Sequence, residues 1–221
     1  MPITRPRAAI FDLDGTIIDN MVLHAEAFAL FAVRHGLPAP TRADRAKLDG
    51  RRNSEIFPVL FGREMPRDEW LAHEHEKEAL YRELSRGRLT PVAGLTALLG
   101  RLAARRIAVA LATSAPELNV AHTLGELGLT DTFPTIVRGD QVARGKPAPD
   151  VFLEASRRVN VPPGECVVFE DAPMGITAAR AAGMRVVAMT TSFTAAQFEA
   201  LDDPPDLACR DFDAFLALAN W

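Results

Sequence analysis

The segment IFDLDGTIID, residues 10–19, carries two aspartates, Asp12 and Asp14, on either side of one leucine. They follow a short apolar run, and a carboxylate at the end of a buried strand is costly unless its charge is compensated. Residues two apart in an extended segment point the same way. One carboxylate can therefore attack a phosphorus atom while the other exchanges a proton with the bridging oxygen. Gly15 lets the backbone approach a ligand closely.

Polar residues also follow other apolar runs, and they include both signs of charge. Thr113 and Ser114 end one run, Glu170 and Asp171 end another, and Lys146 lies in a loop before an expected helix. Hard carboxylate oxygens are typical Mg²⁺ ligands, whereas lysine, hydroxyls and helix-start amides favour a phosphate. Such a set leaves charge unbalanced unless a cation and an anion complete it. The pattern therefore predicts a Mg²⁺ site beside a phosphate site.

The segments that must position these side chains alternate between strands and helices. Five runs lack polar alternation, as expected of strands covered on both faces: 7–11, 107–112, 135–137, 166–170 and 184–189. Helical patterns lie between them, at residues 94–104, 117–127, 149–159 and 173–182. Repeated strand-helix units predict an α/β fold with a doubly wound, mostly parallel, Rossmann-like sheet. Ligands of such sheets bind at the carboxyl ends of the strands. The sequence SAPE, residues 114–117, also predicts a capping box at a helix start.

Residues 20–87 interrupt this alternation, because they contain no strand-like run and show helical spacing. The apolar residues with this spacing are Ala27, Phe28, Phe31, Trp70, Leu71, Leu80 and Leu84. We expect a helical cap domain over residues 20–87, inserted into a catalytic core of residues 1–19 and 88–221. The sequence HEHE, residues 73–76, lacks the spacing of a HisGluxxHis metal site and predicts a solvated cap surface.

The composition narrows the functional classes. The chain has 221 residues, 48% of them hydrophobic, which is enough for a large core and a smaller insert. A formal charge of -4 with scattered arginines predicts no nucleic-acid partner. The first apolar run ends at Phe11, which is too short for a signal peptide or a membrane span. Cys166 and Cys209 indicate buried thiols rather than a disulfide framework. We expect a cytoplasmic monomer without membrane contacts.

Four segments resemble, in order and spacing, the motifs of the haloacid dehalogenase superfamily. They are FDLDGT (11–16), ATS (112–114), GKPAPD (145–150) and FEDAPMG (169–175). The insert after the first motif and the run GITAARAAGM (175–184) are similar to the β-phosphoglucomutase-like branch, whose members have a helical cap. The resemblance covers nearly the whole chain.

The resemblance implies a role for each motif residue. Asp12 would be the nucleophile that forms an aspartyl-phosphate, and Asp14 would protonate the leaving group and then activate water. Thr113 and Lys146 would hold the transferring phosphoryl group. The implied Mg²⁺ ligands are the Asp12 side chain, the Asp14 backbone carbonyl and Asp171, with Glu170 close by.

The cap loop DGRRN, residues 49–53, departs from the pattern Lys-Gly-x-x-Arg that β-phosphoglucomutases carry there. In that pattern the lysine contacts the catalytic region and the arginine binds the distal phosphate of a sugar bisphosphate. Asp49 and Asn53 occupy those positions here, although Arg51 or Arg52 could substitute by a small shift. The departure favours hydrolysis of a small phosphate monoester, such as a sugar phosphate. The candidate substrate-binding residues of the cap are His24, Asp49, Gly50, Arg51, Arg52 and Asn53.

Three alternatives remain open. His24 stands where mutases place a cap-hinge histidine, which keeps a β-phosphoglucomutase-type mutase in consideration, and a partly buried structural histidine fits equally well. An acidic Asp49 would suit a small, highly charged substrate, as in an inorganic pyrophosphatase. A non-catalytic phosphate-binding regulatory module would tolerate the loss of Asp12 or Lys146, and both are present. The expected partner is a small phosphorylated metabolite, and hinges near residues 19–20 and 87–91 are expected to open the cap.

Overall fold

The computed structural model describes residues 5–219 as an α/β protein on one six-stranded sheet. In sheet order the parallel strands are β3 (Thr135–Arg138), β2 (Ala108–Thr113), β1 (Ala8–Phe11), β4 (Cys166–Glu170), β5 (Arg185–Met189) and β6 (Leu207–Cys209). The chain builds outward from β1 in one direction and then returns to β4 on its other side, which makes a doubly wound sheet with a switch point at β1 and β4. The predicted fold class is confirmed, and each predicted strand matches an observed one to within one residue at each end.

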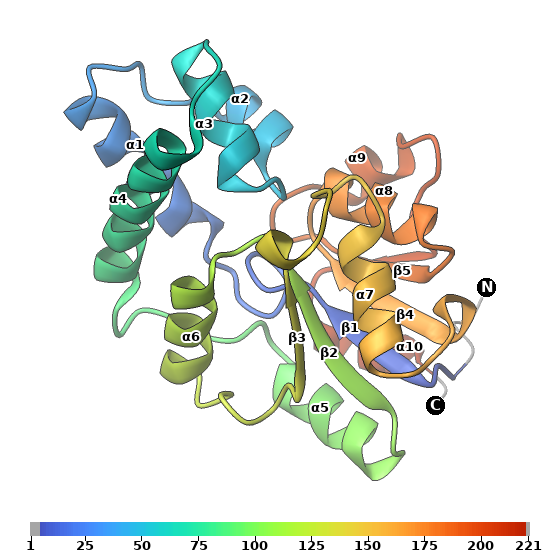
Figure 1. Ribbon diagram of the computed structural model, residues 1–221. Coiled ribbons are helices and arrows are strands. Elements are labelled where there is room, and N and C mark those ends of the chain that lie inside the picture. Colours follow the sequence, from blue (N-terminus) through green and yellow to red (C-terminus); the bar gives the residue numbers. More distant parts are fainter. Residues whose placement is uncertain (1–4, 220–221) are drawn as a thin grey trace.

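Helices cover both faces of the sheet (Figure 1). On one face, α7 (Asp150–Arg158) and α8 (Pro173–Ala181) pack on the central strands. On the other, α5 (Leu95–Ala104) packs on β2, and α6 (Glu117–Glu126) contributes to the same apolar cluster. Successive residues of β1 enter these two clusters alternately, so both sides of each central strand are buried. Burial on both faces is why these strands lack polar alternation in the sequence. The four predicted core helices are confirmed, again to within one residue.

Three elements near the end of the chain were not anticipated from the sequence. They are α9 (Ala195–Glu199), β6 and α10 (Phe212–Leu218). Each is too short to show a clear hydrophobic period. Their ends are set by local hydrogen bonds, since Thr194 accepts from Gln197 N and Asp211 accepts from Ala214 N as N-caps. Short capped elements of this kind depend on tertiary packing.

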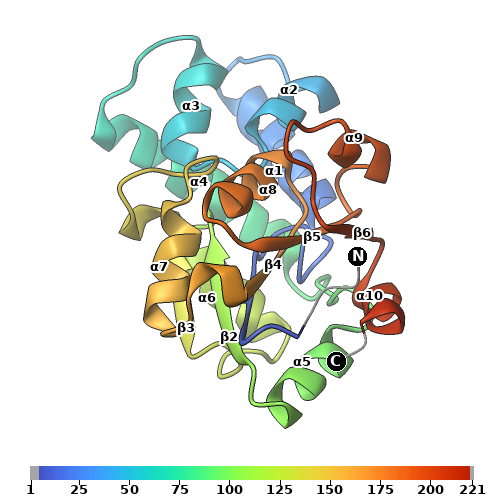
Figure 2. The same cartoon turned by 90° about the vertical axis from the view of Figure 1, so that its right-hand side faces the viewer.

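Between β1 and α5 the chain forms four helices, which lie together at the top of Figure 2. They are α1 (Met21–Arg34), α2 (Arg42–Leu48), α3 (Asn53–Phe61) and α4 (Arg67–Ser85). They share an apolar cluster of their own, which includes the fully buried Phe31, Phe57 and Tyr81. The two connections to the sheet run side by side, because Ile18 pairs with Pro91 in an isolated bridge. The inserted helical cap is confirmed, whereas its domain boundaries at residues 20 and 87 stay a prediction.

The HEHE segment lies in α4, and the prediction that it forms a solvated surface was wrong in part. His75 is exposed, but the His73 ring stacks on Phe61 with centroids 4.6 Å apart. Lys77 and Glu78, which follow, are 2% and 3% exposed. Helical spacing places His73 and Lys77 on the face that packs against α1 and α3. No helix within residues 5–219 is both long and apolar enough to cross a bilayer.

Truncation of the cap core should destabilise the protein. We expect Phe57→Ala to lower the free energy of unfolding by about 3–5 kcal/mol, because Phe57 is fully buried and packs on Phe31 at 5.3 Å. Urea denaturation measures the change. The matched control Val59→Ala on the same helix, where Val59 is 62% exposed, should cost less than about 0.5 kcal/mol. Equal effects of the two substitutions would contradict the observed packing.

Candidate active site

The carboxyl ends of β1, β2 and β4 bring the charged motif residues together. Phe11 and Phe169 are opposite each other in adjacent strands, so Asp12 and Glu170 leave the sheet side by side. Thr113 is the last residue of β2, the neighbour of β1 on its other side. The site therefore lies at the topological switch point, where an open α/β sheet forms its ligand crevice.

Lys146 provides the fixed positive charge of the site. Its Nζ donates to Asp12 Oδ1 and to Glu170 Oε1, both at 2.6 Å, and the residue is 1% exposed. Burial alone would lower the pKa of a lysine. The charges of Asp12 and Glu170 outweigh that effect and hold the pKa of Lys146 above its usual value. Lys146 is therefore a charged ammonium in direct contact with Asp12.

Carboxylates outnumber cations at this point. Oxygens of Asp12, Glu170 and Asp171 lie within 4.8 Å of one another, and all three residues are buried. Burial raises the pKa of Asp12 to about 7, although Lys146 opposes the shift. Burial and the charges of Glu170 and Asp12 also raise the pKa of Asp171. A compact set of oxygen ligands that repel one another fits a hard divalent cation such as Mg²⁺. Asp12, Glu170 and Asp171 are the side chains that could hold it.

Two glycines permit this crowding. A Cβ on Gly15 would lie 2.0 Å from Asp171 Oδ2, and a Cβ on Gly175 would lie 1.7 Å from Glu170 Oε1. Gly15 also has a φ of 77°, which residues with side chains rarely adopt. Its close approach is thus to Asp171, and Gly15 is not among the described residues that line the cavity below. This corrects the expectation that Gly15 contacts the substrate.

Asp14 has a different environment from Asp12. Asn20 Nδ2 donates to Asp14 Oδ1 at 2.6 Å and to the Tyr81 hydroxyl at 2.5 Å. Burial would raise the pKa of Asp14, but the His24 imidazole and the Asn20 amide outweigh it and hold the pKa below its usual value. The surroundings therefore shift the pKa values of the two aspartates in opposite directions. Such a separation is typical of carboxylates with different catalytic roles.

A buried polar network on the cap forms the opposite wall, and the sequence analysis did not identify it. Lys77 Nζ donates to Glu78 Oε1 at 3.0 Å. Glu78 also accepts from Asn53 Nδ2 at 2.8 Å and from Asn119 Nδ2 at 2.6 Å. Asn119 belongs to α6 of the core, so the network joins the cap to the core. Glu78 neutralises the charge of Lys77 within the wall.

His24 connects this network to Asp14. Its Nδ1 lies 2.9 Å from Lys77 Nζ, and a lysine ammonium can only donate, so Nδ1 accepts and the proton of a neutral ring is on Nε2. Nε2 lies 3.5 Å from Asp14 Oδ1, and within residues 5–219 it has no hydrogen-bond partner. The ring stacks on Tyr81 with centroids 3.8 Å apart. A buried N–H donor beside Asp14 is thus available to an oxygen of a ligand.

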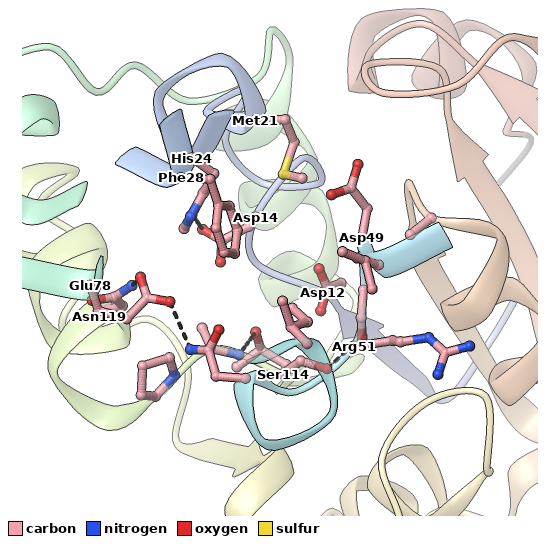
Figure 3. A pocket seen from close by; sticks show the side chains of 18 of the residues that line it. Asp12, Asp14, Met21, His24, Phe28, Asp49, Arg51, Glu78, Ser114 and Asn119 are labelled. Carbon is pink, nitrogen blue, oxygen red and sulfur yellow. Dashed lines mark hydrogen bonds and ion pairs between the residues drawn. The ribbon is translucent and has the colours of Figure 1, made fainter. Parts of the chain in front are cut away.

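The two walls enclose a cavity of about 80 Å³ (Figure 3). The predicted site residues that line it are Asp12, Asp14, His24, Asp49, Gly50, Arg51, Asn53, Thr113, Ser114 and Asp171. Lys146 and Glu170 contact each other and Asp12, outside the described lining. Most of the predicted constellation is therefore assembled around one small cavity, and the substrate contacts assigned to its members stay predictions.

Ser114 has a role other than the predicted one. Its hydroxyl donates to Gly50 O at 2.7 Å and so joins the core to the cap loop. The predicted capping box was wrong, because α6 begins at Glu117 after Pro116 without a side-chain cap. Burial of the loop against the cap determines the direction of the Ser114 side chain.

The two loop arginines also differ from expectation. Arg52 Nη2 donates to Glu55 Oε1 at 2.9 Å, Arg52 Nη1 lies 3.3 Å from Gly139 O, and Arg52 is outside the described lining of the cavity. Arg51 Nε donates to Lys47 O at 3.1 Å, and its guanidinium extends away from Asp14 and Glu78 (Figure 3). Arg52 therefore holds the cap on the core in this arrangement and does not face the substrate.

Comparisons with known proteins agree with this arrangement. The family model described as "Haloacid dehalogenase-like hydrolase" matches residues 9–189. The "Phosphorylated carbohydrates phosphatase" of Thermotoga maritima is 35% identical over 182 residues, which cover 80% of this chain and 82% of that protein. The "Beta-phosphoglucomutase" of Bacillus subtilis is 34% identical over 188 residues, 82% of each chain. A crystal structure of a family IA hydrolase from Entamoeba histolytica superposes with a TM-score of 0.84 at 28% identity, covering 93% of both chains.

Metal binding should depend on pH through the buried carboxylates. Because burial raises the pKa of Asp12 to about 7 and also raises that of Asp171, Mg²⁺ must displace protons below that pH. We expect Mg²⁺ affinity to rise from about pH 5.5 to about pH 8, with protons released on binding. Calorimetry in two buffers of different ionisation enthalpy measures both quantities.

The metal-free protein gives the matching stability test. The folded state holds the Asp12 proton up to about pH 7, whereas the unfolded state loses it near its ordinary pKa of 3.8, so ionisation should lower stability across that range. Asp12→Asn should remove this slope, and the exposed control Asp131→Asn should retain it. Mg²⁺ binding without proton release at about pH 6 would contradict the assignment of the carboxylate site.

Proposed function

Because this chain belongs to the haloacid dehalogenase-like hydrolase family, we propose that it is a phosphatase acting on a small phosphorylated carbohydrate. The contact between charged Lys146 and Asp12 is the observation that carries this proposal. It sets a carboxylate at a switch-point crevice beside a fixed cation, which favours attack on an anionic phosphorus centre. We include in the proposal the cytoplasmic, monomeric character expected from the sequence.

The residues of the site support a two-step mechanism. An oxygen of Asp12 attacks the phosphorus atom and forms an aspartyl-phosphate, while Asp14 gives a proton to the leaving oxygen. Asp14 then takes a proton from water, which cleaves the aspartyl-phosphate and regenerates Asp12. Lys146 and the Thr113 hydroxyl are the candidates for binding the phosphoryl oxygens. Mg²⁺, held by Asp12, Asp171 and Glu170, would supply charge neutralisation for the reacting phosphate.

The pKa values of the two aspartates indicate why metal and substrate are both needed. Without them, burial favours the proton on Asp12, while its neighbours favour ionised Asp14. The chemistry needs the reverse. A divalent cation next to Asp12 lowers its pKa, and a phosphate dianion next to Asp14 raises the pKa of that residue. The order of the two pKa values would therefore invert when the site is filled.

The cap residues favour hydrolysis of a monophosphate. Lys77 is neutralised by Glu78, Arg51 is bound to a backbone carbonyl, and Asp49 brings a negative charge to the cavity. A second phosphate would therefore meet a wall without net positive charge. The hydroxyls of a carbohydrate instead meet polar groups, since Asn53, Glu78 and His24 Nε2 line the same cavity.

Access requires the cap to move. A cavity of about 80 Å³ holds a phosphate with a few waters but not a whole hexose phosphate. The contacts Ser114 to Gly50, Arg52 to Gly139 and Asn119 to Glu78 close it on the cap side. We propose that these contacts break when substrate enters, with bending near residues 19–20 and 87–91.

A phosphosugar mutase is the second candidate, because His24 Nε2 is a free donor beside Asp14 and the chain is similar to a β-phosphoglucomutase. A mutase returns the phosphoryl group from Asp12 to another oxygen of the sugar, so it releases no net phosphate. Inorganic pyrophosphate and a non-catalytic role are distinguished by the same assays.

Removal of the nucleophile should abolish turnover. We expect Mg²⁺-dependent phosphate release from a panel of hexose, pentose and hexitol monophosphates, and a loss of at least about 1,000-fold in Asp12→Asn. Asp14→Asn should lose about 100-fold to 10,000-fold. The matched control Asp19→Asn, an exposed residue of the same segment, should stay near wild type.

Product analysis separates the candidates. Conversion of a sugar 1-phosphate to its 6-phosphate without release of inorganic phosphate would replace the phosphatase by the mutase. Faster turnover of pyrophosphate than of every ester would favour a pyrophosphatase. Retention of activity in Asp12→Asn would overturn the mechanism.

Reversal of the charge at residue 49 should change substrate preference. Asp49→Lys puts a cation into the cavity, so we expect the ratio of kcat/KM for a hexose bisphosphate over the monophosphate to rise about tenfold. Steady-state assays with both substrates measure the ratio. Asp131→Lys, the same charge change at an exposed position, controls for net charge. An unchanged ratio in Asp49→Lys would show that the cap wall does not select by charge.

A further inference from the structure

Outside the residues that line the cavity, two histidines and a glutamate meet between α1 and α4. His35 follows the last residue of α1, and His73 and Glu76 lie one turn apart on α4. His35 Nε2 is 2.8 Å from Glu76 Oε2, and one ligand atom of each residue lies within 4.8 Å of the other two. All three are partly buried, and the proposed phosphatase chemistry uses none of them.

Aromatic packing fixes both imidazole rings. His73 stacks on Phe61 at 4.6 Å with the planes 17° apart, and the rings of His35 and His73 are nearly perpendicular at 4.9 Å. Phe31 contacts both rings, at 4.3 Å and 5.5 Å. Rings held by their neighbours lose little rotational freedom on binding an ion. The apolar surroundings also strengthen electrostatic attraction to a cation.

We propose that His35, His73 and Glu76 form a second metal site, which binds Zn²⁺ or a similar transition-metal ion and links the end of α1 to α4. Two imidazoles and one carboxylate are a common zinc ligand set that leaves one position for water. Imidazole nitrogen also selects against Mg²⁺, which prefers oxygen ligands. The site is thus chemically distinct from the carboxylate cluster at Asp12.

The distances suit such an ion. Bonds of about 2.0–2.1 Å in a tetrahedral zinc site set the ligand atoms about 3.3 Å apart. The separations here run from 2.8 Å between His35 and Glu76 up to the 4.8 Å limit of the cluster. Small side-chain rotations therefore suffice. The ion would replace the hydrogen bond between His35 and Glu76 by two bonds to the metal.

The surrounding charges are compatible with a cation. Arg34 Nη1 lies 3.3 Å from Glu76 Oε1, which leaves Oε2 for the ion. Glu69 Oε1 lies 3.8 Å from His73 Nε2 and can accept the ring N–H that a metal-bound histidine usually donates. Arg63 pairs with Glu69. Two arginines and two glutamates balance, so the ion does not enter a positively charged site.

Cobalt titration of the full chain tests the proposal. Co²⁺ serves as a spectroscopic probe for a four-coordinate zinc site, and millimolar Mg²⁺ keeps the carboxylate cluster filled. We expect one equivalent of Co²⁺ to give visible bands of tetrahedral type, which an equivalent of Zn²⁺ removes. His73→Gln and His35→Gln should each weaken binding at least about tenfold. The matched control His75→Gln, an exposed histidine of the same helix, should bind like wild type.

Two further measurements keep the test decisive. Glu76→Gln changes the most exposed of the three ligands, so it should lose the ion even where a histidine variant unfolds. Zn²⁺ should raise the Tm of wild type but not that of Glu76→Gln, and phosphate release with Mg²⁺ should be equal in the two proteins. The proposal fails where wild type shows no tetrahedral bands, or where His35→Gln and Glu76→Gln titrate like wild type.

Discussion

The structure depends on one buried contact, the Lys146 ammonium between Asp12 and Glu170. Three carboxylates gather at the ends of β1 and β4, and only this lysine offsets them directly. The fold provides what the contact requires: adjacent parallel strands align the carboxylates, and glycines leave room for them. The remaining negative charge attracts a divalent cation, and the filled site can then receive a phosphate. Phosphoryl chemistry follows from this balance of charge.

The cap contributes a second polar wall whose charges are balanced internally. Lys77 and Glu78 neutralise each other, and Asn119 joins the pair to the core. A wall of this kind offers hydrogen bonds without net charge, which suits a hydroxylated leaving group better than a second phosphate. The core would therefore determine the reaction and the cap would determine the substrate. The contacts that close the cavity also explain why binding and opening must be coupled.

Much of this could be predicted from local patterns, and the exceptions have physical causes. Unbroken apolar runs predicted β1 to β5 because both sheet faces are covered, whereas β6 and α10 are too short for any period to show. Adjacent motif residues such as Asp12 and Asp171 were placed correctly because parallel strands end at one edge. The direction of the Ser114 and Arg52 side chains depends on contacts between cap and core, which no local pattern encodes. Lys77 did leave a signal, since it lies on the apolar stripe of α4 with Leu80, where a charge needs a partner.

The central claim is that a divalent ion completes the carboxylate cluster. Crystals soaked with Mn²⁺ and a phosphate mimic test it most directly, because Mn²⁺ gives an anomalous signal and takes the same oxygen ligands as Mg²⁺. The account predicts one strong peak in contact with Asp12 and Asp171, with the mimic between the ion, Lys146 and Thr113. A peak elsewhere, or a mimic bound away from Asp12 while the cluster stays empty, would contradict it.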